Sequence, residues 1–248
     1  MTADPTAAVK PPRSLTRLAG RAIGEFGMIR DGDRILLGLS GGKDSLSLLH
    51  VLLYFQRRAP VRFELGVVTV DPRHEQFDPS PLKDYVPRLG LPYHYVSEPV
   101  AELAAKHMDN DSYCAFCARM RRGLMYGVAR REGYGVLALA QHLDDIAESF
   151  LMSLLFGGRL KTMKAHYTVA EGDLRVIRPL IFARERQTRG FARDAGLPVI
   201  PENCPACFAM PTQRQRMKEL LSTLESHNKG VFSSIETAIL PLISINTA

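Results

Sequence analysis

The stretch LLGLSGGKDSLSLLHVLL, residues 36–53, decides the fold of this 248-residue chain. A short apolar run ends in two glycines, a lysine, an aspartate and serines, and leucines then recur at the spacing of a helix. Glycines between a strand and a helix allow close backbone approach, and the N–H groups at the helix start attract an anion. The stretch therefore predicts a strand, an anion-binding loop and a helix.

Strand-like and helix-like segments alternate on both sides of this loop. A helix over 14–29, with Ser14 as its N-cap, precedes the first strand. The later strands are expected at FELGVVTVD, PYHYVSE, YGVLALA and LRVIRPL, and the later helices at SPLKDYVPRLG, 115–132, 143–156, 184–195 and twice within 211–240. This order predicts an α/β fold, a doubly wound parallel sheet that binds its ligands at the carboxyl ends of the strands.

Charge and hydropathy limit the partners. A formal net charge of +6 and a pI near 9.2 favour an anionic partner, nucleic acid first. The sequence has no apolar run long enough to span a bilayer, and residues 1–13 lack the apolar segment of a secretory signal. We expect a cytoplasmic protein with no membrane partner.

The loop does not match a Walker A motif. Aligning Gly42 and Lys43 puts Leu37 where that motif has its first glycine, and Asp44 where it has a hydroxyl residue. The six residues instead resemble the pyrophosphate loop of the PP-loop ATPases, enzymes that split ATP into AMP and pyrophosphate while adenylating a substrate oxygen. The resemblance implies ATP binding by Ser40, Gly41, Gly42, Lys43, Asp44 and Ser45.

Acidic residues follow two other strands. Asp71 ends the second strand, where it either lies beside the nucleotide or begins a surface turn before Pro72. Asp144, Asp145 and Glu148 follow a later strand, and they either act in the site or cap the helix there. PP-loop enzymes often carry Gly-His-Asn-x-Asp-Asp at this place, so the resemblance favours a catalytic role for both aspartates. This chain departs from that pattern at Ala140, Gln141 and His142, which leaves the role of those three residues open.

All four cysteines fall in two CxxC pairs, Cys114 with Cys117 and Cys204 with Cys207. In a reducing compartment such pairs indicate metal or redox chemistry, and four unrelated thiols are the alternative. The pairs are too far apart for a compact zinc knuckle, so the tertiary fold has to assemble any joint site. Thiolate ligands suit zinc and iron–sulfur clusters equally, so the residue types leave the metal open.

From about residue 15 to 242, this chain resembles the tRNA 2-thiocytidine synthetases. The likeness is carried by four stretches of this chain, in the same order: CAFCARMRR, AQHLDDIAES, VIRPLIFARERQ and PENCPACFAM. The resemblance implies a 4Fe-4S cluster on Cys114, Cys117 and Cys207 with one iron open to sulfide. Cys204 is then a spare thiol that could carry a persulfide or act as a fourth ligand. The implied partners are tRNA and a cysteine desulfurase or another sulfur donor, and the family suggests a homodimer.

The implied reaction has two steps. ATP with Mg²⁺, bridged by Asp44 or Asp145, adenylates the cytosine C2 oxygen, and sulfide on the open iron then attacks C2 and expels AMP. Arg121, one helical turn past Cys117, is expected nearest the reaction. We accordingly expect 1–13 to be disordered, 14–210 to form the ATP- and cluster-binding domain, and 211–248 to form a helical extension packed on it.

Three basic clusters are expected to contact tRNA phosphates, although each alone is typical of a solvated helix face. Their members are Arg119, Arg121 and Arg122, then Arg184, Arg186 and Arg189, then Arg214, Arg216 and Lys218. Three alternative functions stay open: a 2-thiouridine synthetase, a lysidine synthetase, and a non-catalytic metal- and RNA-binding redox protein. Lysidine synthetases need no cluster, and the thiouridine enzymes carry cysteines at the chain ends that this chain lacks.

Overall fold

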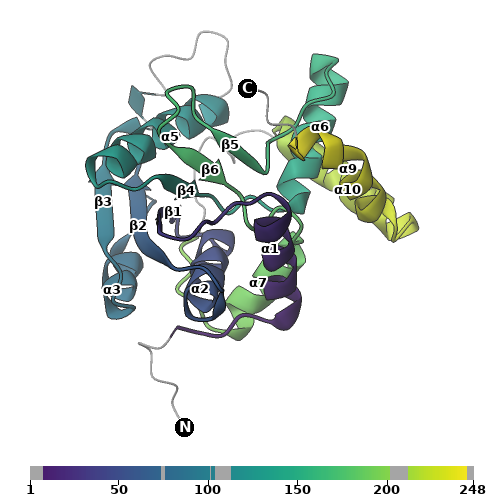
Figure 1. Ribbon diagram of the computed structural model, residues 1–248. Coiled ribbons are helices and arrows are strands. Elements are labelled where there is room, and N and C mark those ends of the chain that lie inside the picture. The colour runs from purple at the N-terminus through teal and green to yellow at the C-terminus, as the bar shows by residue number, and fades with distance from the viewer. Residues whose placement is uncertain (1–7, 74–75, 101, 104–112, 202–211, 245–248) are drawn as a thin grey trace.

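A six-stranded sheet forms the centre of the computed structural model (Figure 1). The structure describes residues 8–73, 76–100, 102–103, 113–201 and 212–244, and only the backbone at 113–115. The strand order is β3-β2-β1-β4-β6-β5, and every neighbouring pair is parallel except β5 with β6. The strands are β1 Asp33–Gly38, β2 Phe63–Asp71, β3 Tyr93–Ser97, β4 Val136–Ala138, β5 His166–Thr168 and β6 Arg175–Ile177. The predicted α/β fold is confirmed.

Helices cover both faces of the sheet. They are α1 Arg13–Glu25, α2 Lys43–Arg58, α3 Ser80–Arg88, α5 Tyr113–Arg131, α6 Leu143–Gly157, α7 Glu185–Asp194, α9 Gln213–His227 and α10 Val231–Ser244. In β1, Ile35 and Leu37 join the large core under α1, α2 and α7, whereas Leu36 joins a smaller core under α5. Alternate strand residues point to opposite faces, so burial on both faces explains the continuous apolar run in β1.

The chain reverses its direction of travel across the sheet between β1 and β4. From β1 it moves to β2 and β3, and after α5 it returns to β4 on the other side of β1. The loops that leave the carboxyl ends of β1 and β4 diverge at this point, where open α/β sheets bind ligands. The topology therefore brings the glycine-rich loop next to residues 140–142.

Two local expectations are wrong. The first helix begins at Arg13, not after an N-cap at Ser14, because the Pro12 carbonyl already accepts N–H groups from Leu15 and Thr16 at 3.0 and 3.1 Å. Strand β5 was not expected; it has three residues, lies at the antiparallel edge and is only half-buried, so its apolar pattern is too weak to predict.

The described part of the N-terminal segment contacts the fold, unlike the disorder expected for all of 1–13. The Val9 N–H donates to Nδ1 of the buried His50 at 3.1 Å, and Pro11 is buried. Residues 1–7 lie outside the described residues. The Val9 contact therefore joins this segment to α2.

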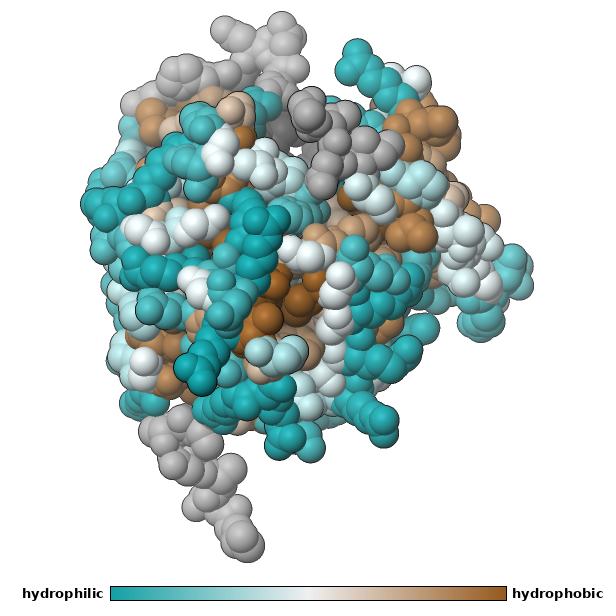
Figure 2. Space-filling model, in the orientation of Figure 1, coloured by the Kyte–Doolittle hydropathy of each residue, from teal (hydrophilic) through white to brown (hydrophobic). Residues whose placement is uncertain are grey.

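The two C-terminal helices pack on α6 at one side of the sheet (Figure 1). Met217 and Leu221 of α9 and Phe232 and Ile239 of α10 are buried. Hydrophobic residues remain on the surface over this part of the molecule (Figure 2), among them Phe156 at the end of α6. None of the helices in the described ranges has the length and apolar character needed to cross a membrane.

Candidate active site

The glycine-rich loop opens into a pocket of about 340 Å³. The loop contributes Ser40, Gly42, Asp44 and Ser45, and apolar side chains of Val68, Val70, Met125, Leu139 and Met163 form much of the remaining wall. Helix α5 contributes Arg121 and Arg122, the β4 loop contributes Ala140 and Gln141, and α6 contributes Asp145. Arg178 and Arg214 complete the lining. Segments far apart in sequence thus converge where the strand-end rule expects a ligand.

The loop needs glycine at position 41. Gly41 has φ +87°, and a Cβ there would lie 2.7 Å from Cδ1 of Ile200. Gly42 then forms the N-cap of α2, and the Ser45 hydroxyl donates to the Gly42 carbonyl at 2.9 Å while lying 3.1 Å from the Ser40 hydroxyl. The first N–H groups of α2 have no acceptor within the helix, so the loop presents donors suited to a phosphate.

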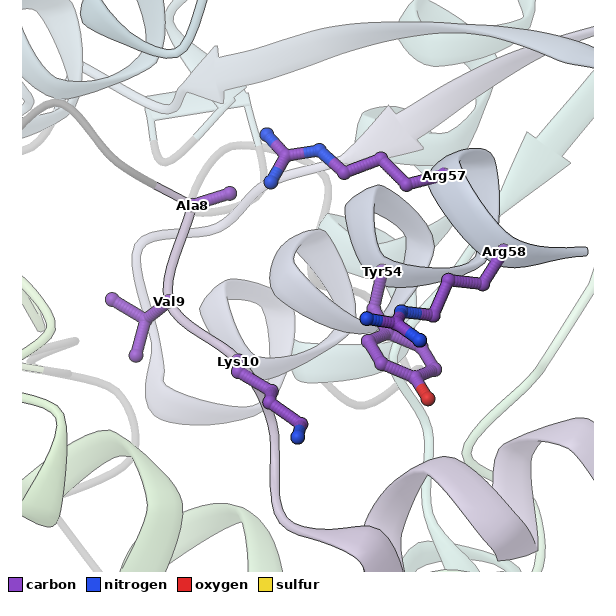
Figure 3. Close-up of a pocket in the computed structure, with 6 residues that line it drawn as sticks. All are labelled: Ala8, Val9, Lys10, Tyr54, Arg57 and Arg58. Carbon is purple, nitrogen blue, oxygen red and sulfur yellow. The ribbon is translucent and has the colours of Figure 1, made fainter.

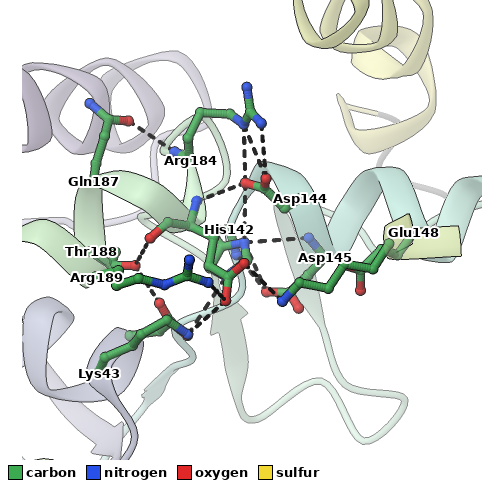
Figure 4. Close-up of polar contacts among 12 residues, drawn as sticks. Lys43, His142, Asp144, Asp145, Glu148, Arg184, Gln187, Thr188 and Arg189 are labelled. Carbon is green, nitrogen blue, oxygen red and sulfur yellow. Dashed lines mark hydrogen bonds and ion pairs between the residues drawn. The ribbon is translucent and has the colours of Figure 1, made fainter. Parts of the chain in front are cut away.

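Lys43, at the start of α2, is held by several partners (Figure 4), and the next residue, Asp44, is held as well. Lys43 Nζ lies 3.0 Å from Asp44 Oδ2 and 3.0 Å from Glu185 Oε1, and the Thr188 hydroxyl donates to Asp44 Oδ1. Burial opposes the charge on Asp44, but His142, Lys43 and Thr188 outweigh it and lower the pKa of that carboxyl. Asp44 is therefore an ionised carboxylate in the pocket at neutral pH.

Glu185, which the sequence analysis did not single out, joins three cations. Besides Lys43, it contacts Lys218 of α9 at 2.9 Å and Arg189 at 2.9 Å. Burial would raise its pKa, but Lys218 and Lys43 outweigh burial and lower it to about 2. In the sequence Glu185 is one acid among arginines at a helix start, and only the tertiary fold shows its partners.

His142 and Asp145 begin α6 as a reciprocal cap. The His142 N–H donates to Asp145 Oδ2 at 3.0 Å, and the Asp145 N–H donates to His142 Nδ1 at 3.4 Å. His142 Nε2 also lies 3.6 Å from Asp44 Oδ2. Burial would lower the pKa of His142, but Asp44, Asp145 and Asp144 raise it overall. Asp145 is thus both a cap and a pocket residue, and His142 connects it to Asp44.

Two of the aspartates predicted for the site do not line the pocket. Asp144 accepts from Arg184 at 3.1 Å and from the Glu185 N–H at 2.7 Å. Asp71 ends β2 as expected, but its carboxylate accepts from the Tyr95 hydroxyl and from the Arg73 N–H. Both carboxylates therefore hold neighbouring segments in place.

The C-terminal helix α9 reaches the pocket through Arg214. Its Nε lies 3.0 Å from Glu148 Oε2, and its Nη2 lies 3.7 Å from Asp145 Oδ1. Burial raises the pKa of Glu148 to about 7, Arg214 opposes this shift, and Asp145 adds to it. Arg214 is therefore the residue by which α9 closes the acidic side of the pocket.

Several cations predicted to bind RNA form ion pairs with other residues of this chain. Arg184 forms two hydrogen bonds with Glu225 at 2.8 and 2.9 Å, and Lys218 contacts Glu185. By contrast, Arg121 and Arg122 face the pocket from α5. The second cluster thus mainly joins α7 to α9.

Cys117, the second cysteine of the first CxxC pair, lies next to a residue that lines the pocket. Cys117 is half-buried in α5 and directly precedes Ala118, which lines the pocket. Cys114 belongs to the first turn of the same helix, and Cys204 and Cys207 lie outside the described residues. Within the described ranges no three His, Cys, Asp or Glu residues form a metal-binding group.

A second pocket of about 330 Å³ lies at the other end of α2 (Figure 3). Lys10, Tyr54, Arg57 and Arg58 line it with two N-terminal apolar residues. It contains none of the predicted site residues. Arg57 and Arg58 lie in the last turn of α2, where cations stabilise a helix.

The chain is similar to known proteins over most of its length. A family model described as the PP-loop domain matches residues 14–204. The tRNA-cytidine(32) 2-sulfurtransferase of Geobacter sulfurreducens is 40% identical over 228 residues, 92% of this chain and 89% of that protein. The enzyme of the same name from Pelobacter propionicus is 41% identical and covers 92% of this chain and 85% of that protein.

A solved structure shows the same fold. The U34-tRNA thiolase NcsA from Methanococcus maripaludis, solved with its 4Fe-4S cluster, superimposes with a TM-score of 0.76 and 20% identity, covering 94% of this chain and 79% of that one. The fold and the loop define a PP-loop protein. The matches over most of the sequence go further: the chain belongs to the tRNA-cytidine(32) 2-sulfurtransferase family within the PP-loop proteins.

Proposed function

We propose that this chain uses ATP to activate a cytidine in the tRNA anticodon loop and replaces its C2 oxygen with sulfur. One observation carries the proposal: the glycine-rich loop and the Cys117-bearing helix α5 lie on the same pocket. The relatives named above are tRNA sulfurtransferases, which supports the same conclusion. A reaction that couples adenylation to sulfur transfer needs these two elements close together.

ATP fits the loop side of the pocket. The N–H groups at the start of α2 and the Lys43 ammonium would hold its pyrophosphate end. Asp44 and Asp145 both line the pocket, and carboxylate oxygens are the ligands that Mg²⁺ prefers. Mg²⁺ bound there would neutralise charge on the phosphates during adenylation.

The cysteines would hold the iron–sulfur cluster. Their thiolates suit such a cluster, and Cys117 stands next to a pocket-lining residue; we propose Cys114, Cys117 and Cys207 as ligands and Cys204 as a persulfide carrier or fourth ligand. When bound, a 4Fe-4S cluster with an open iron would supply the sulfide that replaces the oxygen. A cysteine desulfurase together with a two-electron reductant, or another donor of sulfide, would provide that sulfur.

The chain's own residues orient the reactants. Arg121, one turn after Cys117, would bind phosphate or the cytosine oxygen at the pocket wall. The apolar wall would exclude water, which strengthens the electrostatic interactions of Lys43 and Asp44 with the reacting groups. Asp144 would act indirectly, by holding Arg184 and the start of α7. We also propose a cytoplasmic location and a homodimer.

The test measures AMP release with and without tRNA. We expect Lys43→Met to lower kcat/KM for ATP by about 100-fold or more, because it removes a preorganised charge from the phosphate site. Lys10→Met in the distant pocket is the matched control and should leave the rate unchanged. If tRNA binds but no AMP forms, a non-catalytic RNA-binding protein is the better account.

A further inference from the structure

Arg178 is a buried cation in the wall of the pocket. It directly follows β6, its exposed fraction is only 2%, and it lines the pocket together with Arg121 and Arg122. The sequence places it in the VIRPL segment, to which the proposed function gives no role.

Its partners among the described residues are all neutral. Nε donates to Gln141 Oε1 at 2.9 Å, and Nη1 donates to the Lys164 carbonyl at 2.6 Å. The guanidinium carbon lies 5.5 Å from the centre of the Tyr167 ring. Across the described ranges, Arg178 forms no ion pair with a carboxylate.

Two arginines that are less deeply buried than Arg178 do have acidic partners. Arg175, three residues earlier, pairs with Asp33, and Arg184 pairs with Asp144 and Glu225. A buried charge is costly unless a counter-charge accompanies it. Burial lowers the pKa of Arg178, Tyr167 opposes this shift, and the nearby charge of Arg122 adds to it. The missing counter-charge is therefore best supplied by a ligand in the pocket.

We propose that Arg178, oriented by Gln141, binds a phosphate group of the substrates in this pocket. The inference rests on the proposed function, because that function brings both phosphate sources here: the α-phosphate of ATP or AMP, and a backbone phosphate of tRNA. A planar guanidinium can form two parallel hydrogen bonds with such a group. The role also explains the departure at residue 141, since a glutamine side chain there holds the guanidinium without neutralising it.

The experiment measures the dissociation constants of three probes with the full chain: AMP, α,β-methylene-ATP with Mg²⁺, and a cytidine-containing anticodon stem-loop RNA. Arg178→Gln is compared with wild type and with Arg175→Gln, which removes a half-buried arginine outside the pocket. We expect Arg178→Gln to raise the dissociation constant of at least one probe by about tenfold or more, the usual loss for a hydrogen bond to a charged group. Arg175→Gln should alter the melting temperature and leave all three constants unchanged.

The probe whose binding is weakened by Arg178→Gln shows which phosphate Arg178 contacts. Weaker binding of AMP and the ATP analogue indicates the α-phosphate. Weaker RNA binding, with the slope of log affinity against log salt concentration reduced in magnitude by about one, indicates a phosphate of the RNA backbone. A folded Arg178→Gln protein that binds all three probes like wild type overturns the inference. If Arg178→Gln does not fold, Arg178→Lys decides, because lysine keeps the charge but not the planar geometry; unchanged binding there also overturns it. Wild-type protein that binds none of the probes contradicts the proposed function as well.

Discussion

Glu185 Oε1 lies 3.0 Å from Lys43 Nζ, so a carboxylate on α7 holds the lysine of the glycine-rich loop. The other oxygen of Glu185 contacts Lys218 of α9 at 2.9 Å. One side chain thus joins the loop to the C-terminal helix, and it fixes the lysine where the phosphates are proposed to bind.

Replacing Glu185 should destabilise the protein. Its side chain is only 12% exposed, and Glu185→Gln leaves Lys43 and Lys218 without their shared counter-charge. We expect a loss of about 1–3 kcal/mol in the free energy of unfolding, measured with urea. The control is Glu64→Gln, because the Glu64–Arg34 pair has a similar length of 2.7 Å but is solvent-exposed and should contribute at most about 1 kcal/mol. Equal effects of the two substitutions would contradict this role.

The contribution of Glu185 to the free energy of unfolding should depend on pH in the acidic range. Its pKa is about 2 in the fold and 4.5 ordinarily, so the unfolded chain takes up the proton first as pH falls. The stability that Glu185 contributes is therefore complete above pH 4.5 and lost between pH 4.5 and about 2. Urea curves of wild type and Glu185→Gln should converge over this range, and a constant difference would count against the network.

The contribution of Glu148 to stability should change with pH in the opposite direction. Its pKa is raised to about 7 by burial, so the folded chain keeps a proton that the unfolded chain releases above about pH 4.5. Wild-type stability should therefore fall, relative to Glu148→Gln, as pH rises from 4.5 to about 7, and the difference should then stay constant. Parallel stability curves for the two proteins would show that Arg214 keeps Glu148 ionised throughout.

Gly41→Ala should disrupt the loop. The substitution places a Cβ at φ +87° and 2.7 Å from Ile200. Gly32→Ala is the matched control, because Gly32 has φ +79° but no neighbour within 4 Å. Gly32→Ala should cost only the left-handed backbone penalty of about 1–2 kcal/mol, whereas Gly41→Ala should cost more and also weaken ATP binding. Similar thermal stability and ATP affinity in both variants would refute the steric argument.

The cysteine assignment predicts metal content. Protein purified without oxygen should contain about four irons and four sulfides per chain. Cys117→Ser and Cys207→Ser should each lose the cluster and tRNA thiolation. Stoichiometric zinc without labile sulfide, or full activity of Cys207→Ser, would rule out the cluster role.

Short sequence patterns predicted most of the strands and helices of the fold. The loop lies between β1 and α2 as expected, and β2 has the bounds of the predicted FELGVVTVD segment. Ser14 was predicted as the N-cap of the first helix, but that helix begins at Arg13. Strand β5 is too short to carry a pattern. Buried strands and amphipathic helices are encoded locally, so they are readable from sequence, while edges and caps depend on single contacts.

The site was predicted less completely. Asp44 and Asp145 line the pocket, but Asp71 and Asp144 are held by neighbouring segments. Of the cationic partners of Glu185, Arg189 lies four residues later in the same helix, but Lys43 and Lys218 come from α2 and α9 and gave no sequence signal. Such interactions depend on how helices distant in sequence pack together, which spacing along the chain does not encode.

The central claim is tested most directly by nucleoside analysis of tRNA after incubation with the anaerobically purified chain, ATP, Mg²⁺ and a sulfide source. The account predicts 2-thiocytidine in the anticodon loop, formed only with ATP and matched by one AMP for each sulfur transferred. Thiolation of a uridine, a lysine-modified cytidine, or 2-thiocytidine formed without ATP would contradict it.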